Sequence, residues 1–142
     1  MEEVSKSKSL ERGDVREEIE LTVKTTPFET LDDNLKLAFE CADEKKAVDS
    51  VILDLRDVTS FTEFFLITSG TNQRQVQAIA DEITSKVRKA FKQRPIRVEG
   101  YAAAEWVLLD YGDFIVHIFN EKSREFYDLE RLWRDAAKVE LA

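Results

Sequence analysis

The amino-acid sequence predicts an α/β fold with a single mixed five-stranded sheet and helices mainly on one face. Two long stretches carry apolar residues at helical spacing, and short apolar runs of strand length lie between and after them. A glycine-containing turn between two of these runs indicates a β-hairpin, because glycine supplies the positive φ that tight hairpin turns require. With 142 residues, the chain is long enough for one domain with a sizeable core.

The expected elements follow the order α-β-β-α-β-β-β-α. A first helix is expected over residues 26–46, with Thr26 as its cap and an apolar stripe along one side. The segment Ser69-Gly70-Thr71-Asn72 is expected to cap the second long helix, and Asn120 a last helical stretch that reaches residue 136. Strands are expected over residues 51–55, 64–68, 96–98, 105–110 and 113–119.

The hairpin, with its turn at Tyr111-Gly112, has two largely apolar faces. Side chains alternate along a strand, which divides them into two sets. One set is Val107, Leu109, Phe114, Val116 and Ile118, and the other is Trp106, Leu108, Asp110, Ile115, His117 and Phe119. Either helices cover both faces, or one face stays exposed and binds a partner such as another protein or a second copy of the chain.

Composition favours a cytoplasmic protein with a basic partner. The chain has no apolar run near the roughly 18 residues of a membrane span, and its first residues lack the apolar core of a signal peptide. Its single cysteine, Cys41, suits a reducing compartment and is expected to pack in the core. The net charge of −8 argues against direct nucleic-acid binding. Residues 1–25 are expected to form a flexible charged arm, 26–136 the domain and 137–142 a tail.

Enzymatic chemistry has weak support in the sequence. His117 is the only histidine, and the chain has neither a phosphate-binding loop nor a dinucleotide fingerprint. The alternative is a magnesium-dependent nucleotidyltransferase that uses acids at strand ends and backbone N–H groups of Ser69-Gly70-Thr71. Turn conformation explains these residues better than a metal site, and no catalytic residue, metal or cofactor is expected. The acids are Asp54, Asp57, Asp110 and Asp113.

Several blocks of the chain closely resemble the ribosomal silencing factor RsfS, or Iojap/YbeB, family. The resemblance covers residues 31–133, with Glu105-Trp106, Asp110-Tyr111-Gly112-Asp113 and Tyr127-Asp128-Leu129-Glu130 in the family's order and spacing. It implies a nucleotidyltransferase-like fold that lacks the catalytic motif. It also implies binding to the large ribosomal subunit through ribosomal protein L fourteen, which sterically blocks joining with the small subunit and represses translation under nutrient limitation. A role in large-subunit maturation and a homodimer are further implications.

The resemblance also assigns a ribosome-binding face centred on Trp106. From its position alone, Trp106 suits equally a partly buried sheet residue and a binding hot spot. Asp110 and His117 are expected beside it together with Leu108 of the same strand face. Glu99, Gly100, Tyr111, Gly112 and Asp113 are expected near its rim, while Tyr127, Leu129 and Glu130 either join the face or dock the last helix.

Overall fold

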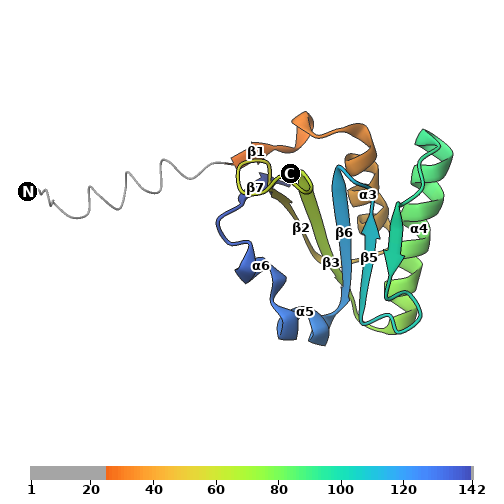
Figure 1. Cartoon of the computed structure of the whole chain (residues 1–142). Helices are drawn as coiled ribbons and strands as arrows, with labels where there is room; N and C mark the ends of the chain where they lie inside the picture. The colour runs from red at the N-terminus through yellow and green to blue at the C-terminus, as the bar shows by residue number, and fades with distance from the viewer. Residues whose placement is uncertain (1–24, 142) are drawn as a thin grey trace, which may run out of the picture.

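A computed structural model describes residues 25–141 as a mixed sheet with helices on both faces (Figure 1). The sheet has seven strands in the order β1-β7-β2-β3-β6-β5-β4. The central strands β3 and β6 are parallel, and β5 pairs antiparallel with β6 and β4. The strands are β1 Thr25–Pro27, β2 Val48–Asp54, β3 Phe64–Gly70, β4 Arg97–Glu99, β5 Trp106–Asp110, β6 Phe114–Asn120 and β7 Ala137–Glu140.

Two long helices, α3 (Asp33–Glu44) and α4 (Gln73–Phe91), cover one face of the sheet. The Asn72 side chain accepts a hydrogen bond from the backbone N–H of Gln75, so it caps α4 as predicted. The side of α4 toward the sheet buries an apolar stripe that interlocks with the β5 and β6 side chains. This stripe consists of Val76, Ile79, Ala80, Ile83 and Val87.

Two short helices, α5 (Glu121–Tyr127) and α6 (Leu129–Leu132), lie on the opposite face (Figure 1). The predicted division of the hairpin is confirmed, because Val107 and Leu109 belong to the core under α3 and α4. Trp106, Leu108 and Phe119 belong to a smaller apolar cluster on the α5–α6 side. The sheet therefore separates two cores, and the second face has only a partial cover.

Both ends of the domain differ from the sequence-based expectation. Five strands were expected, but β1 and β7 pair with each other at one edge of the sheet, so the described residues form seven. Thr26 does not cap a helix: it lies in β1, and its hydroxyl donates to the Asp54 carboxylate over 2.6 Å. A 3₁₀-helix, η1 (Phe28–Thr30), follows, and within the described residues the first α-helix, α3, begins only at Asp33. The expected tail contains β7, while the arm predicted for residues 1–25 lies, apart from Thr25, outside the described residues.

The last helical stretch is broken, where one helix was expected. Asp128 adopts a left-handed conformation with φ of 49°, which ends α5 and turns the chain into α6. Asn120 caps α5 through its side chain as predicted, by accepting from the backbone N–H of Lys122. Within residues 25–141, no helix has the length and apolar character needed to cross a membrane.

Candidate functional site

Trp106 is the centre of the second sheet face, and its neighbours hold its ring in one orientation. Its indole Nε1 donates a hydrogen bond to Nδ1 of His117 over 3.0 Å. The ring stacks on Phe119 with centroids 4.9 Å apart and contacts the Tyr127 ring at 4.8 Å. Trp106 is nevertheless only half-buried, so part of a fixed aromatic surface remains open to solvent. We call Trp106, Leu108, Asp110, Ile115, His117 and Phe119 the Trp106 face.

His117 is a buried neutral partner of the tryptophan. Because indole N–H can only donate, Nδ1 of His117 is the acceptor and the ring proton lies on Nε2. Nε2 is buried and has no hydrogen-bond partner among the described residues. Phe65 packs edge-to-face against the imidazole at 4.4 Å. Burial lowers the pKa of His117 to about 3, so the imidazole stays neutral near pH 7 and supports Trp106 rather than exchanging protons.

Acidic groups lie beside the apolar surface. Asp110 accepts a hydrogen bond from the backbone N–H of Gly112 and is 3.5 Å from the Arg97 guanidinium. Glu99 on β4 is 3.3 Å from the same guanidinium. Leu108 is half-buried opposite Glu99, so an aliphatic strip connects Trp106 to this charged edge. Arg97 was not anticipated, although it stands directly opposite Asp110 in the β4–β5 register.

The two glycines proposed near the rim have conformational roles. Gly100 has φ of +78°, and a Cβ there would lie 2.1 Å from the Trp106 carbonyl oxygen, so only glycine lets the chain pass this close to β5. Gly112 has φ of +88° in the hairpin turn. Asp113 is exposed beside that turn.

Tyr111 was expected near the rim of the Trp106 face, and that prediction is wrong. It is buried in the core under α3 and α4, where its ring stacks on Phe114 at 4.9 Å. Burial raises the pKa of Tyr111 to about 12. Side chains alternate along β5, with Val107 and Leu109 on the helix side. Continuing this alternation by two residues places Tyr111 on the helix side as well.

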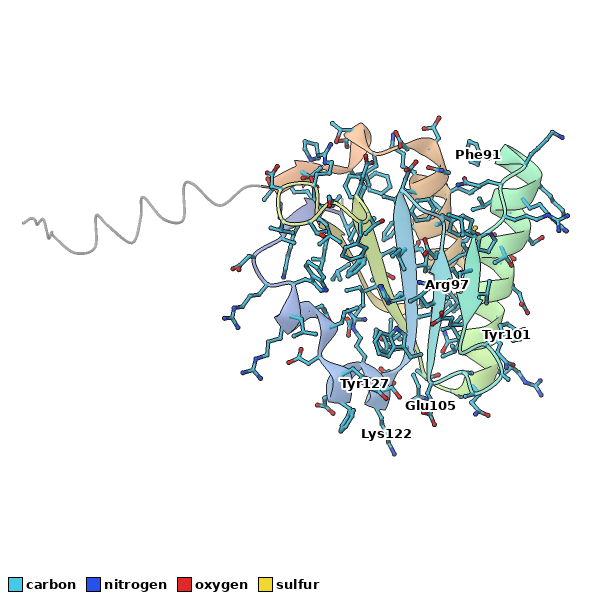
Figure 2. All side chains as sticks on the ribbon, viewed as in Figure 1. Phe91, Arg97, Tyr101, Glu105, Lys122 and Tyr127 are labelled. Carbon is cyan, nitrogen blue, oxygen red and sulfur yellow. The ribbon has the colours of Figure 1, made fainter. Side chains whose placement is uncertain are left out.

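Arg124 links α5 and α6 to the sheet through hydrogen bonds. Its guanidinium donates to the Glu130 carboxylate over 3.0 and 3.1 Å, and to Oγ of Ser69 over 2.9 Å. Glu130 thus joins α6 to α5, and Leu129 is buried against the sheet. Tyr127 is about half exposed, 47%, while it contacts Trp106, so it both docks α5 and extends the open aromatic surface (Figure 2). Arg124 was missed because nothing in its local sequence reveals contacts with β3.

The acids of the nucleotidyltransferase alternative are not assembled into one site. Asp54 lies on β2 and Asp110 on β5, with β3 and β6 between them, which separates the strands by about 14 Å at the usual strand spacing. Burial would raise the pKa of Asp54, but hydrogen bonds from Arg56 and Thr26 lower it to about 2. Thr71 N–H donates to Oε1 of Gln75, and so is already occupied. The described residues contain no cluster of three or more potential metal-binding side chains.

Comparison with known proteins identifies the family. Residues 28–142 match the family model described as "Ribosomal silencing factor during starvation", RsfS. The chain belongs to the RsfS family. It is 44% identical over 110 residues to "Ribosomal silencing factor RsfS" of Halalkalibacterium halodurans, a match that covers 75% of this chain and 91% of that protein.

Structure and more distant relatives agree with this RsfS assignment. A crystal structure of a Chromobacterium violaceum protein superposes with a TM-score of 0.69 at 35% identity, covering 71% of this chain and 83% of the other. A mouse relative is named "Mitochondrial assembly of ribosomal large subunit protein 1"; it is 30% identical over 93 residues, which are 63% of this chain and 40% of that protein. The RsfS relatives are named as silencing factors and not as enzymes.

Proposed function

We propose that this RsfS protein binds the large ribosomal subunit through ribosomal protein L fourteen and sterically blocks joining with the small subunit. Translation would thereby be repressed under nutrient limitation. The observation that carries the proposal is the fixed, partly exposed indole of Trp106 on a sheet face that α5 and α6 cover only in part. Aromatic residues held in this way lose little conformational freedom on binding and are frequent hot spots of protein interfaces.

The charged edge of the Trp106 face supports a basic partner. Asp110 and Glu99 adjoin the apolar strip and share one arginine, Arg97, which leaves the cluster with a net negative charge. Basic side chains of a ribosomal protein would complement these acids and set the register and the association rate more than the affinity. The net charge of −8 acts in the same direction over longer distances.

Blocking by occupancy requires no catalytic step and no cofactor. The protein acts by excluding the small subunit, so only the affinity and placement of the complex matter. We further propose that the protein works in the cytoplasm and forms a homodimer when free. We also propose that the fold is nucleotidyltransferase-like but lacks the catalytic motif, and fold kinship by itself does not establish an activity.

Co-sedimentation with purified large subunits tests the binding face. Trp106→Ala should reduce affinity by about 30-fold, which corresponds to about 2 kcal/mol, a usual hot-spot loss. Phe91→Ala is a matched control, because Phe91 is an exposed aromatic residue at the end of α4, on the opposite face of the sheet from Trp106. Circular dichroism establishes that both variants are folded. A folded Trp106→Ala protein that binds as tightly as the natural chain contradicts the assignment.

Adding small subunits to the same reaction separates the proposal from a second candidate, a large-subunit maturation factor. The mouse relative's name, which refers to large-subunit assembly, favours this candidate. If the protein binds the large subunit and prevents formation of joined ribosomes, steric exclusion is supported. Binding with unchanged joining supports a maturation role. A protein that stays in the supernatant refutes both.

A further inference from the structure

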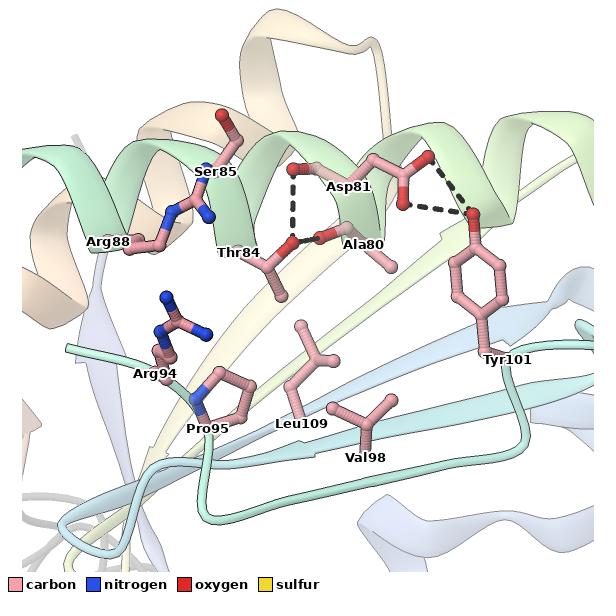
Figure 3. Close-up of a pocket in the computed structure, with 10 residues that line it drawn as sticks. All are labelled: Ala80, Asp81, Thr84, Ser85, Arg88, Arg94, Pro95, Val98, Tyr101 and Leu109. Carbon is pink, nitrogen blue, oxygen red and sulfur yellow. Dashed lines mark hydrogen bonds between the residues drawn. The ribbon is translucent and has the colours of Figure 1, made fainter.

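A groove on the helix side of the sheet lies between α4 and the edge strand β4, away from the Trp106 face. It has a volume of about 460 Å³, and Ala80, Pro95, Val98 and Leu109 contribute apolar parts of its lining. Figure 3 shows Arg88 and Arg94 together at one end and the Tyr101 hydroxyl donating to Asp81 at the other. We call this space the α4–β4 groove.

Among residues 25–141, the two arginines at the end of the groove have no anionic partner. Neither Arg88 nor Arg94 makes an ion pair or hydrogen bond with another side chain among the described residues. In a chain of net charge −8, cations left unpaired beside an apolar groove favour an anionic ligand. The positive charge at this end of the groove is opposite in sign to the charge at the acidic edge of the Trp106 face.

The backbone of β4 offers hydrogen bonds beside the groove. The backbone N–H of Tyr111 donates to the carbonyl oxygen of Phe114, and that of Asn120 donates to the carbonyl oxygen of Glu105. Because backbone groups alternate in direction along a strand, the N–H and C=O groups of residues 105, 107, 109 and 111 all point toward β6. Alternation turns those of Leu108 and Asp110 toward β4, opposite Glu99 and Arg97. The N–H and C=O of Val98 therefore point out from β4, the last strand on that side of the described sheet.

We propose that the α4–β4 groove binds an extended acidic segment of a partner protein, which adds to β4 as a further antiparallel strand. Peptides bind in this way where an edge strand borders a groove: main-chain bonds supply affinity and alternate side chains supply specificity. Val98 would exchange the main-chain bonds, and the groove would receive every second side chain of the peptide. The proposal concerns a second surface, the α4–β4 groove, and the peptide would also contact Arg97 and Glu99, which lie at the charged edge of the Trp106 face.

The β4 register specifies the peptide's side-chain pattern. A residue opposite Val98 points into the groove and should be apolar. In an antiparallel strand the next residue stands opposite Arg97 and should be acidic, while the preceding one stands opposite Glu99 and should be basic. The residue after the first acid again faces the groove, at the end that holds Arg94, and should also be acidic. The expected order is basic, apolar, acidic, acidic.

Fluorescence anisotropy with the full chain tests this pattern. The probe is a labelled peptide of sequence Ala-Lys-Leu-Glu-Glu-Ala with blocked ends, compared with its charge-reversed form Ala-Glu-Leu-Lys-Lys-Ala. We expect saturable binding of the first peptide, at least tenfold weaker binding of the second, and about a tenfold loss with Arg88→Glu and Arg94→Glu combined. The matched control combines Arg74→Glu with Lys122→Glu, which changes the net charge equally at exposed positions outside the groove.

Several results would overturn the proposal. These are no saturable binding at millimolar protein, equal binding of both peptides, or an equal loss with the control variant. Sedimentation of the free chain addresses a second copy as the occupant. If the chain forms a dimer that Arg97→Glu dissociates and Trp106→Ala leaves intact, β4 pairs with its own copy and the acidic-peptide proposal is wrong. A chain that is monomeric, or a dimer that Arg97→Glu leaves intact or Trp106→Ala also dissociates, supports an edge that is free for the peptide.

Discussion

The buried histidine predicts a specific dependence of stability on pH. The pKa of His117 is about 3 in the folded protein against an ordinary value of 6.5. Below pH 6.5 the unfolded chain binds a proton that the folded chain does not, so this contribution to stability is complete above pH 6.5 and is lost as the pH falls. Between pH 7 and pH 5 the free energy of unfolding should decrease by about 2 kcal/mol.

Urea unfolding followed by circular dichroism at pH 7 and pH 5 measures this difference. His117 is the only histidine, so few other groups titrate in this interval. His117→Gln is the informative variant, because an amide oxygen can still accept from the Trp106 indole while the titrating group is gone. Its unfolding free energy should be nearly the same at both pH values. A natural chain equally stable at both, or a His117→Gln variant with the same decrease, refutes the reasoning.

Three further predictions concern stability and reactivity. Gly100→Ala should destabilise the fold by about 2 kcal/mol or more in urea unfolding, because the added Cβ would collide with the Trp106 carbonyl. Gly112→Ala should cost less, because its Cβ would meet only a flexible side chain at 3.3 Å. Equal losses of stability in the two variants would contradict this account. Arg124→Gln should cost about 2 kcal/mol through its lost charged hydrogen bonds, and an unchanged urea midpoint would refute the anchoring role. Burial raises the pKa of Cys41 to about 11, so a thiol reagent at pH 8 should label it far more slowly in native protein than in urea; equal rates would contradict its burial.

Short-range patterns predicted the centre of this fold. The Tyr111-Gly112 turn, the alternation around it and the Asn72 cap depend on neighbours within a few residues, and the structure confirms them. These same patterns place Trp106 and His117 side by side on one face, because both lie on paired strands next to one turn. Predicting the direct hydrogen bond between the two rings would have required the pairing register of β5 and β6, which periodicity does not give.

The features that were missed depend on contacts between distant segments. A strand of three or four residues has no detectable period of its own, so β1 and β7 are defined only by pairing with each other and with β2. Asp128 ends a helix that the apolar spacing predicted as continuous, and after this left-handed residue Leu129 is buried against the sheet and Glu130 pairs with Arg124. Arg124 likewise gains its role from Ser69, a residue of β3.

The pairing of β1 with β7 has a consequence for how the chain is completed during synthesis. Thr25 lies beside Lys138, so strands at opposite ends of the described chain meet at one edge of the sheet. Contacts this far apart in sequence are entropically costly to close and form slowly. While the chain is being made, β2 can pair with β3 on one side, but its other edge has no partner until β7 has been synthesised. We therefore expect this edge of the nascent domain to form last and to be the edge most exposed to incorrect strand pairing.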